Sequence, residues 1–238
     1  MNASRPWPTL VVASALTLVC AVAAGVAGST AGAELTRGPT AAELRAAATR
    51  EVAERWRAWP AGRVFPASLP YAAEQGGEER ARRVGISPDT SCEHLDPSAA
   101  EALRRAGCRA LLRATYIDAL RGVLVTVGVA VLPDEPAAAR ARSAFPEGGE
   151  PVPGLRPLAF AGTVADRFTP AVRQTGSVRQ AGPYLVLTTA GEVDGRPGGA
   201  VGEPRPTVFA FAAELAEEVL AALSTPVMPD CDGEEWRC

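Results

Sequence analysis

His94 is the residue on which the familiar catalytic arrangements would depend, because it is the only histidine in the 238 residues. Serine and cysteine nucleophiles need a base such as imidazole, and catalytic metal centres commonly use it as a ligand. His94 lies between Cys92 and Asp96, in a segment whose composition predicts a loop. Its surroundings match none of the common nucleophile or zinc-protease motifs. We therefore interpret His94 as a solvated loop residue and predict no catalytic residue.

Paired carboxylates are the second arrangement that would support chemistry, since one can act as a general acid and the other as a base. Carboxylates near predicted loops are Glu93, Asp96, Asp118, Asp134, Asp166, Glu192 and Asp194. Several have a simpler role. Asp96 and Asp134 precede predicted helices as caps, and Asp118 ends a predicted strand at a turn, while Asp194 belongs to another turn. A divergent cell-envelope hydrolase stays an alternative.

Cysteine spacing predicts disulfides. Of five cysteines, Cys20 lies in an apolar N-terminal segment, and the other four are Cys92, Cys108, Cys231 and Cys238. An even number in an exported chain favours disulfides, and proximity favours Cys92 with Cys108 and Cys231 with Cys238 among the three pairings. Closely spaced metal-ligand pairs are missing, so the sequence predicts no metal site and no cofactor.

The apolar segment, residues 9–28, carries no charge and has the length of about 20 residues that a helix needs to cross a membrane. Arg5 precedes it without any acid, which places the N-terminus in the cytoplasm and the rest of the chain outside. The length of the segment favours retention as a single-pass anchor. A signal peptide cleaved after Ala33 is the alternative, because Ala31-Gly32-Ala33 fits a small-residue cleavage site, and the protein would then be secreted.

Composition argues against nucleic acid as a partner. The formal net charge is −3, and all 24 basic residues are arginine. Together with abundant alanine, glycine and proline, this arginine usage is typical of a GC-rich genome and gives no electrostatic reason to bind polyanions. The sequence divides into a membrane anchor or signal peptide (1–33), an amphipathic lead-in helix (34–60), an extracytoplasmic domain (61–226) and a cysteine-containing tail (227–238).

The domain is predicted to be α+β. A helix over residues 40–59 begins with the capping box Thr40/Glu43, and a second begins at Asp96-Pro97 and ends at Gly107. Two β-hairpins are expected, residues 110–118 with 122–132 and residues 176–180 with 184–190. Further expected elements are strands 63–66 and 158–162, loops 71–79 and 146–157, and helices 134–144 and 208–223. These elements indicate a two-layer sandwich of an antiparallel sheet with helices on one face.

Two features invite a functional reading but have a structural one. Gly128, inside an apolar strand, indicates a bulge or close helix packing. Trp56 and Trp59 share one helical stripe and are more typical of a core than of an exposed recognition face.

The segments Gly107-Cys108-Arg109, Arg113–Tyr116 and Thr126–Val129 carry a resemblance. Over residues 91–144 the chain resembles uncharacterised membrane-anchored or secreted actinobacterial proteins with an extracytoplasmic α+β domain, and more loosely the extracellular sensor domains of mycobacterial receptor serine/threonine kinases. The resemblance implies a fold and a location, and no binding residue.

These observations favour a membrane-anchored envelope protein that acts as a non-enzymatic binding or accessory module. Its partner would be an envelope protein or a cell-wall or lipid ligand, in connection with secretion or signalling. A small-molecule or lipid carrier is a further alternative, and it predicts a large apolar cavity.

Overall fold

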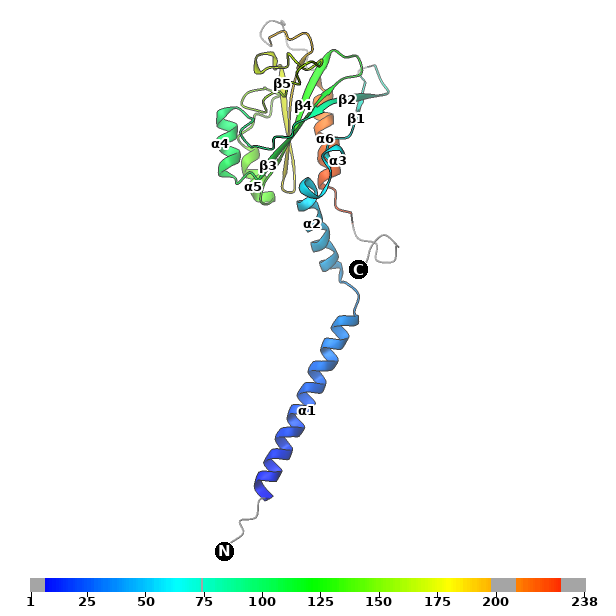
Figure 1. The fold of residues 1–238 in the computed structure, drawn as a ribbon, viewed down its shortest axis with the longest axis vertical. Coiled ribbons are helices and arrows are strands. Elements are labelled where there is room, and N and C mark those ends of the chain that lie inside the picture. Colours follow the sequence, from blue (N-terminus) through cyan, green and yellow to red (C-terminus); the bar gives the residue numbers. More distant parts are fainter. Residues whose placement is uncertain (1–6, 74, 198–208, 228–238) are drawn as a thin grey trace. The chain divides into compact units, whose positions relative to one another are not determined.

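A computed structural model describes residues 7–73, 75–197 and 209–227 (Figure 1). Arg5, Cys231 and Cys238 lie outside the described residues, so the predicted pairing of the last two cysteines lies outside them as well. One compact unit spans Ala48–Val227 and thus includes the second half of the lead-in helix, whereas the sequence placed the start of the domain at residue 61.

The centre of this unit is a six-stranded antiparallel sheet in the order β1-β2-β3-β4-β6-β5. Its strands are β1 (Ser68–Ala72), β2 (Glu78–Ile86), β3 (Ala110–Ile117), β4 (Val123–Val131), β5 (Thr175–Ala181) and β6 (Tyr184–Glu192). The helices are α1 (Trp7–Thr36), α2 (Ala41–Ala58), α3 (Ala61–Val64), α4 (Pro97–Arg105), α5 (Glu135–Arg142), η1 (Pro170–Val172) and α6 (Phe211–Ser224). The predicted α+β class with an antiparallel sheet is confirmed.

Helix α6 packs against one face of the sheet and contacts both edge strands, β1 and β5. A sheet whose two edges reach the same helix must curl around it. Alternation along the strands supplies the apolar side chains of this face, for example Val125, Val127 and Val129 of β4. Trp56 and Trp59 pack, partly buried, against the same cluster, as expected of a core stripe.

The opposite face is covered as well, by α4, α5 and the irregular residues 143–174, which we call the cover segment. Leu111 and Leu185, which point away from α6, pack in a cluster with α4, α5 and Leu155 of the cover segment. The sheet is therefore covered on both faces, whereas the sequence predicted helices on one face.

Glycines in the sheet allow the cover segment to approach it closely. A Cβ atom on Gly85 would lie 2.6 Å from the Phe160 ring, and one on Gly128 would lie 2.9 Å from the Leu155 side chain. Gly128 is in regular register with both neighbouring strands, so it marks neither a bulge nor helix packing, but the approach of the irregular cover segment.

Predictions based on local patterns are confirmed for most elements. Both hairpins are present, and the capping box closes with the Thr40 amide 2.8 Å from Glu43 Oε2. Asp134 caps α5 by accepting from the Ala137 amide at 2.8 Å. Helix α4 ends as expected, because Gly107 has a φ of 82° and the Cys108 amide donates to the Leu103 carbonyl.

Two local predictions are wrong, and a third is right only in part. Residues 63–66 hold the end of a short helix and not a strand, and residues 158–162 form no strand in the described structure. Residues 71–79, expected as an exposed loop, contain the β1–β2 turn, because β1 ends at Ala72 and β2 begins at Glu78. Such a short, largely polar hairpin has little alternation to reveal it, and β1 also contains Pro70.

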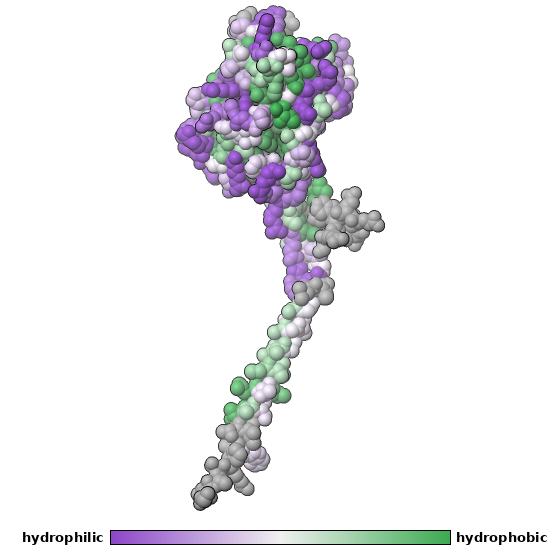
Figure 2. Space-filling model, in the orientation of Figure 1, coloured by the Kyte–Doolittle hydropathy of each residue, from purple (hydrophilic) through white to green (hydrophobic). Residues whose placement is uncertain are grey.

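Helix α1 is apolar and lies outside the compact unit. Every described side chain of residues 11–34 is exposed. In Figure 2 its described surface is nearly free of hydrophilic colour, whereas hydrophilic residues cover much of the folded unit. Residues 11–34 are long and apolar enough to cross a membrane, and a signal sequence has the same properties.

Candidate ligand-binding site

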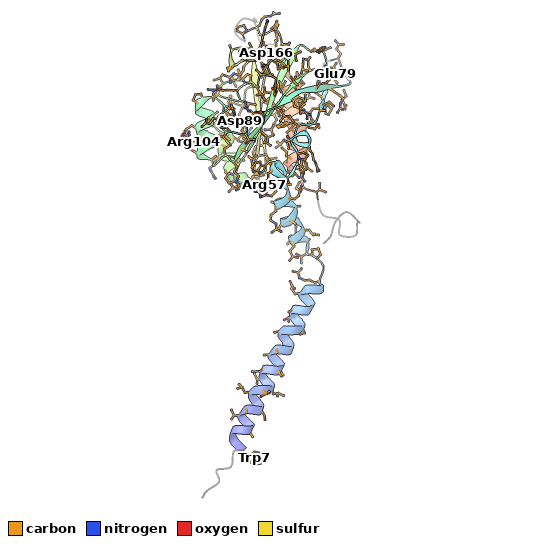
Figure 3. The ribbon with its side chains drawn as sticks, viewed as in Figure 1. Trp7, Arg57, Glu79, Asp89, Arg104 and Asp166 are labelled. Atoms are coloured by element: carbon orange, nitrogen blue, oxygen red, sulfur yellow. A yellow bond between two sulfur atoms is a disulfide. The ribbon has the colours of Figure 1, made fainter. Side chains whose placement is uncertain are left out.

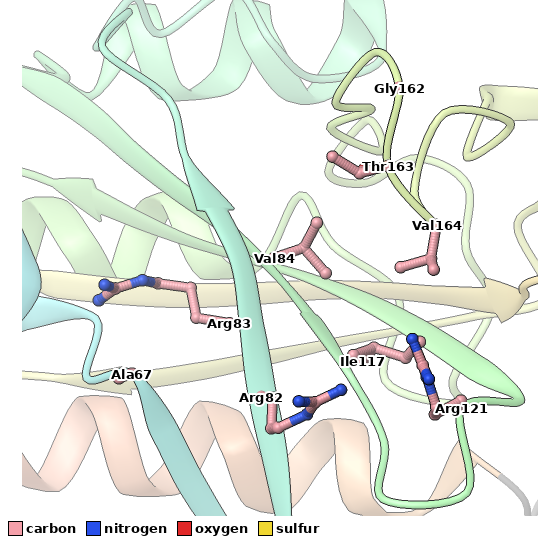
Figure 4. Close-up of a pocket in the computed structure, with 9 residues that line it drawn as sticks. All are labelled: Ala67, Arg82, Arg83, Val84, Ile117, Arg121, Gly162, Thr163 and Val164. Atoms are coloured by element: carbon pink, nitrogen blue, oxygen red, sulfur yellow. The ribbon is translucent and has the colours of Figure 1, made fainter.

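A pocket of about 740 Å³ lies beside the bend of β2, on the face of the sheet that the cover segment occupies (Figure 4). A volume of this size is within the range of small-molecule sites. Its lining comprises Ala67, Arg82, Arg83, Val84, Ile117, Arg121, Gly162, Thr163 and Val164. It thus combines β2, the end of β3, the β3–β4 turn and the cover segment.

Two of these side chains enter the pocket beside a β-bulge in β2. The register with β3 shifts between Arg83 and Gly85, which leaves Val84 as the extra residue. Figure 4 shows Arg82 and Val84 on the pocket side of β2, while Arg83 points the other way. The Arg83 guanidinium is engaged there, since it donates to the Phe65 carbonyl.

Arg121 enters the pocket from the β3–β4 turn with an unusual backbone. Its φ is 60°, and among the described residues it is the one non-glycine residue with a positive φ. A side chain in this left-handed region costs on the order of 1 kcal/mol. Asp118 holds the turn, because its Oδ1 accepts from the amides of Gly122 at 2.8 Å and Val123 at 2.9 Å. Strain of this kind is typical of a residue kept for function.

The two arginines of the pocket are exposed to solvent and have no protein partner among the described residues. In the described part of the chain, neither the Arg82 nor the Arg121 guanidinium has a hydrogen bond or an ion pair, although both line the same pocket. Other exposed arginines, such as Arg109 and Arg140, also have no carboxylate partner in the described structure, but Arg82 and Arg121 lie in the same pocket. Two unpaired guanidinium groups in one pocket favour an anion, since their planar donors match carboxylate and phosphate oxygens.

The remaining side chains give the pocket an apolar side. Val84 and Ile117 belong to the small apolar cluster beneath the cover segment, and Val164 is 38% exposed. At the tip of the adjoining turn, Leu120 is 81% exposed. An anion with an attached apolar group would use both sides of this site.

The predicted disulfide between Cys92 and Cys108 is confirmed, with their Cα atoms 6.4 Å apart. It joins the loop before α4 to the segment that leads into β3. In the chain-entropy treatment, closing a loop of this size stabilises a fold by about 3 kcal/mol. The fifth cysteine, Cys20, is free and exposed on α1.

His94 lies on the loop, as predicted, and contacts Asp89: the atoms Nε2 and Oδ2 are 2.5 Å apart. The Ser91 amide and, to a lesser degree, His94 lower the pKa of the Asp89 carboxyl below its usual range. The nearby hydroxyls have other partners, because Ser87 Oγ contacts the Asp89 backbone and Ser91 Oγ accepts from the Glu93 amide. The loop therefore brings a His–Asp pair together without a hydroxyl on the imidazole.

Most of the carboxylates named from the sequence have a partner of their own. Asp118, Asp134 and Asp194 each accept a hydrogen bond from a backbone amide in their own turn or helix. Glu192 and Asp194 share Arg196, whose Nε lies 4.0 Å from Glu192 Oε2 and 2.5 Å from Asp194 Oδ2, while Glu93 and Asp166 are exposed. Figure 3 shows Glu79, Asp89 and Asp166 in three separate places. Among the described residues, no three His, Cys, Asp or Glu side chains are placed to hold a metal ion.

Asp96 has a different role from the predicted helix cap. It occupies the N-cap position of α4, but its carboxylate makes no cap bond there. Instead Oδ2 accepts from the Gly154 amide at 2.9 Å and from Arg173 Nη1 at 2.8 Å, and Oδ1 accepts from Arg173 Nη2 at 3.2 Å. Asp96 thereby ties the start of α4 to two separate points of the cover segment.

The pocket arginines were not singled out by sequence. All 24 residues counted as lysine or arginine are arginine, and this frequency hides the two that line the pocket. The available signal is Arg121, a long side chain in a tight hairpin turn where glycine or asparagine is expected.

Comparison of the chain with protein-family models, with curated proteins and with solved structures gives no match in any of the three.

Proposed function

We propose that this chain is a binding module of the cell envelope, held at the membrane by α1, and that the pocket of Arg82 and Arg121 is its binding site for an anionic ligand. The observation that carries the proposal is the presence of two unpaired guanidinium groups in one pocket, with Arg121 held in a strained backbone conformation. The function is recognition and not turnover.

A location outside the cytoplasm is part of the proposal. The apolar N-terminal helix and the Cys92–Cys108 disulfide support it independently, because disulfides persist in oxidising compartments. A ligand in this location would be an anionic component of the envelope.

The proposal is tested by calorimetric titration of the full-length chain, in a neutral detergent, with hexyl phosphate. This soluble probe carries a phosphate and a short apolar group. We expect saturable binding of one molecule, and a loss of at least about tenfold in affinity in the double variant Arg82→Gln/Arg121→Gln.

The matched control is Arg109→Gln/Arg140→Gln, which removes the same charge from two exposed arginines outside the pocket. It should bind the probe like the parent chain. Equal binding by the pocket variant and the parent chain would show that these arginines are not the site.

A further inference from the structure

We infer that the ligand of this pocket is an anionic phospholipid of the membrane to which the chain is tethered. Its phosphate would be held by Arg82 and Arg121, and its apolar part would lie against Val84, Ile117 and Val164. The inference rests on the proposed function and names the ligand class of the same site.

The apolar surroundings favour a lipid over a small soluble anion. Leu120 lies in the β3–β4 turn next to Arg121, three residues after the end of β3, and is 81% exposed. An exposed leucine beside cations suits a membrane interface, where apolar side chains enter the acyl region and cations meet phosphate. A hydrophilic anion would leave this leucine and the apolar side of the pocket uncovered.

The neighbouring sheet edge disfavours an acidic peptide. A peptide that adds a strand needs free donors on β1. Backbone pairing of Ala67 with Arg83 and of Ala73 with Gly77 leaves the amides of the even-numbered residues pointing outward. Of these, Pro70 has no N–H, and the Ala72 amide donates to Glu214 Oε2 at 2.7 Å. Two of the three outward positions of β1 therefore offer no free donor, which disfavours strand addition at this edge.

The tether supplies lipid continuously. Only residues 37–47 separate the end of α1 from the compact unit, and from Ala41 onward they are helical, with a rise of about 1.5 Å per residue. A domain attached to its own membrane through so short a segment meets lipid headgroups at a high effective concentration. Even a modest affinity is then sufficient for occupancy.

The test is native mass spectrometry of the full-length chain in neutral detergent, titrated with phosphatidylglycerol, with phosphatidylcholine or with inorganic phosphate. We expect one phosphatidylglycerol to bind at least about tenfold more tightly than phosphatidylcholine, a preference that Arg82→Gln/Arg121→Gln removes. Arg109→Gln/Arg140→Gln should keep the preference, which separates the pocket from lipid bound along α1. Leu120→Ser should lower the affinity for phosphatidylglycerol and leave the affinity for inorganic phosphate unchanged.

Two results overturn the inference in different ways. Arginine-dependent binding of inorganic phosphate without a preference for phosphatidylglycerol would identify a free anion as the ligand, and the proposed function would stand. If the arginine substitutions change the binding of none of the three probes, both the inference and the proposed function are wrong.

Discussion

Arg121 combines a functional position with a cost to the fold. Its guanidinium lines the pocket while its backbone adopts a φ of 60°, which glycine adopts without penalty. Asp118 keeps the turn closed whatever the side chain at position 121, because it binds the amides of Gly122 and Val123. The fold and the pocket therefore make opposite demands on this residue.

The substitution Arg121→Gly should separate these demands. We expect the free energy of unfolding to rise by up to about 1 kcal/mol, because the strain is released, while hexyl phosphate binding weakens. Urea unfolding followed by circular dichroism measures the first effect, and titration measures the second. A loss of stability together with a loss of binding would mean that Arg121 supports the turn itself.

Asp96 illustrates a structural use of charge. The Arg173 side chain is 7% exposed and that of Asp96 is 13%, so little water is available to replace either partner. Asp96→Asn should lower the free energy of unfolding by about 3 kcal/mol, since it leaves a buried guanidinium without its counter-charge. Glu217→Gln, which breaks the exposed pair with Arg179, should cost less than about 1 kcal/mol in the same urea experiment. Equal losses of unfolding free energy in the two variants would show that the Asp96–Arg173 ion pair is exposed to solvent.

Because the chain has no lysine, tyrosine is the main group that titrates near pH 10 and affects stability there. Burial raises the pKa of Tyr184 to about 12, and burial also raises the pKa of Tyr71 to about 12. The pKa of the third tyrosine, Tyr116, is raised as well, again chiefly by burial. In the unfolded chain these groups ionise near pH 10.

Because the folded state prefers the neutral phenol, the tyrosine contribution to stability is complete below about pH 10 and is lost as the pH rises towards 12. We expect absorbance at 295 nm to show tyrosinate only above pH 10 in the folded chain, and near pH 10 in urea. Tyr184→Phe should reduce the alkaline slope of the unfolding free energy. A tyrosine ionisation midpoint near pH 10 in the absence of urea would contradict the burial of these side chains.

At the scale of elements, the cover segment is the part that sequence could not reveal. The sequence predicts both hairpins from β-branched residues and turn glycines, and it predicts α5 from the cap Asp134. These signals act between residues that are close in the chain. The cover segment has no periodicity, and its contacts, such as Leu155 over Gly128, join residues far apart in the chain. For the same reason the pocket, which draws residues from four separate segments, was not predicted.

Gly191→Ala tests how tightly the cover segment is packed. A Cβ atom at this position would lie 2.3 Å from the Val172 carbonyl oxygen, a backbone atom that cannot turn away. We expect a loss of about 2 kcal/mol or more in unfolding free energy. Gly122→Ala, where nothing lies within 4 Å of the added Cβ, is the matched control and should change stability by less than about 1 kcal/mol. Similar stability of both variants would show that the cover segment yields easily.

At the scale of the whole molecule, α1 decides whether the domain stays at the membrane. The helix spans Trp7–Thr36, longer than a hydrocarbon core requires and longer than the usual apolar part of a signal peptide. Charged residues gather at the C-terminal end of this helix, where Arg37 forms ion pairs with Glu34 at 2.6 Å and with Glu43 at 2.7 Å. This change from apolar to charged is typical of the aqueous end of an anchor.

We therefore expect the chain to remain in the membrane pellet after alkaline carbonate extraction, and mass spectrometry to find residues 1–33 still attached. A C-terminal alkaline phosphatase fusion should be active only with α1 present, because the enzyme needs an oxidising compartment, and a fusion lacking residues 1–36 should be inactive. A mature chain that begins at Glu34 would make the protein secreted. The pocket would then meet its ligand without the effective concentration that the tether provides, and the lipid specificity would have to come from contacts in the pocket alone.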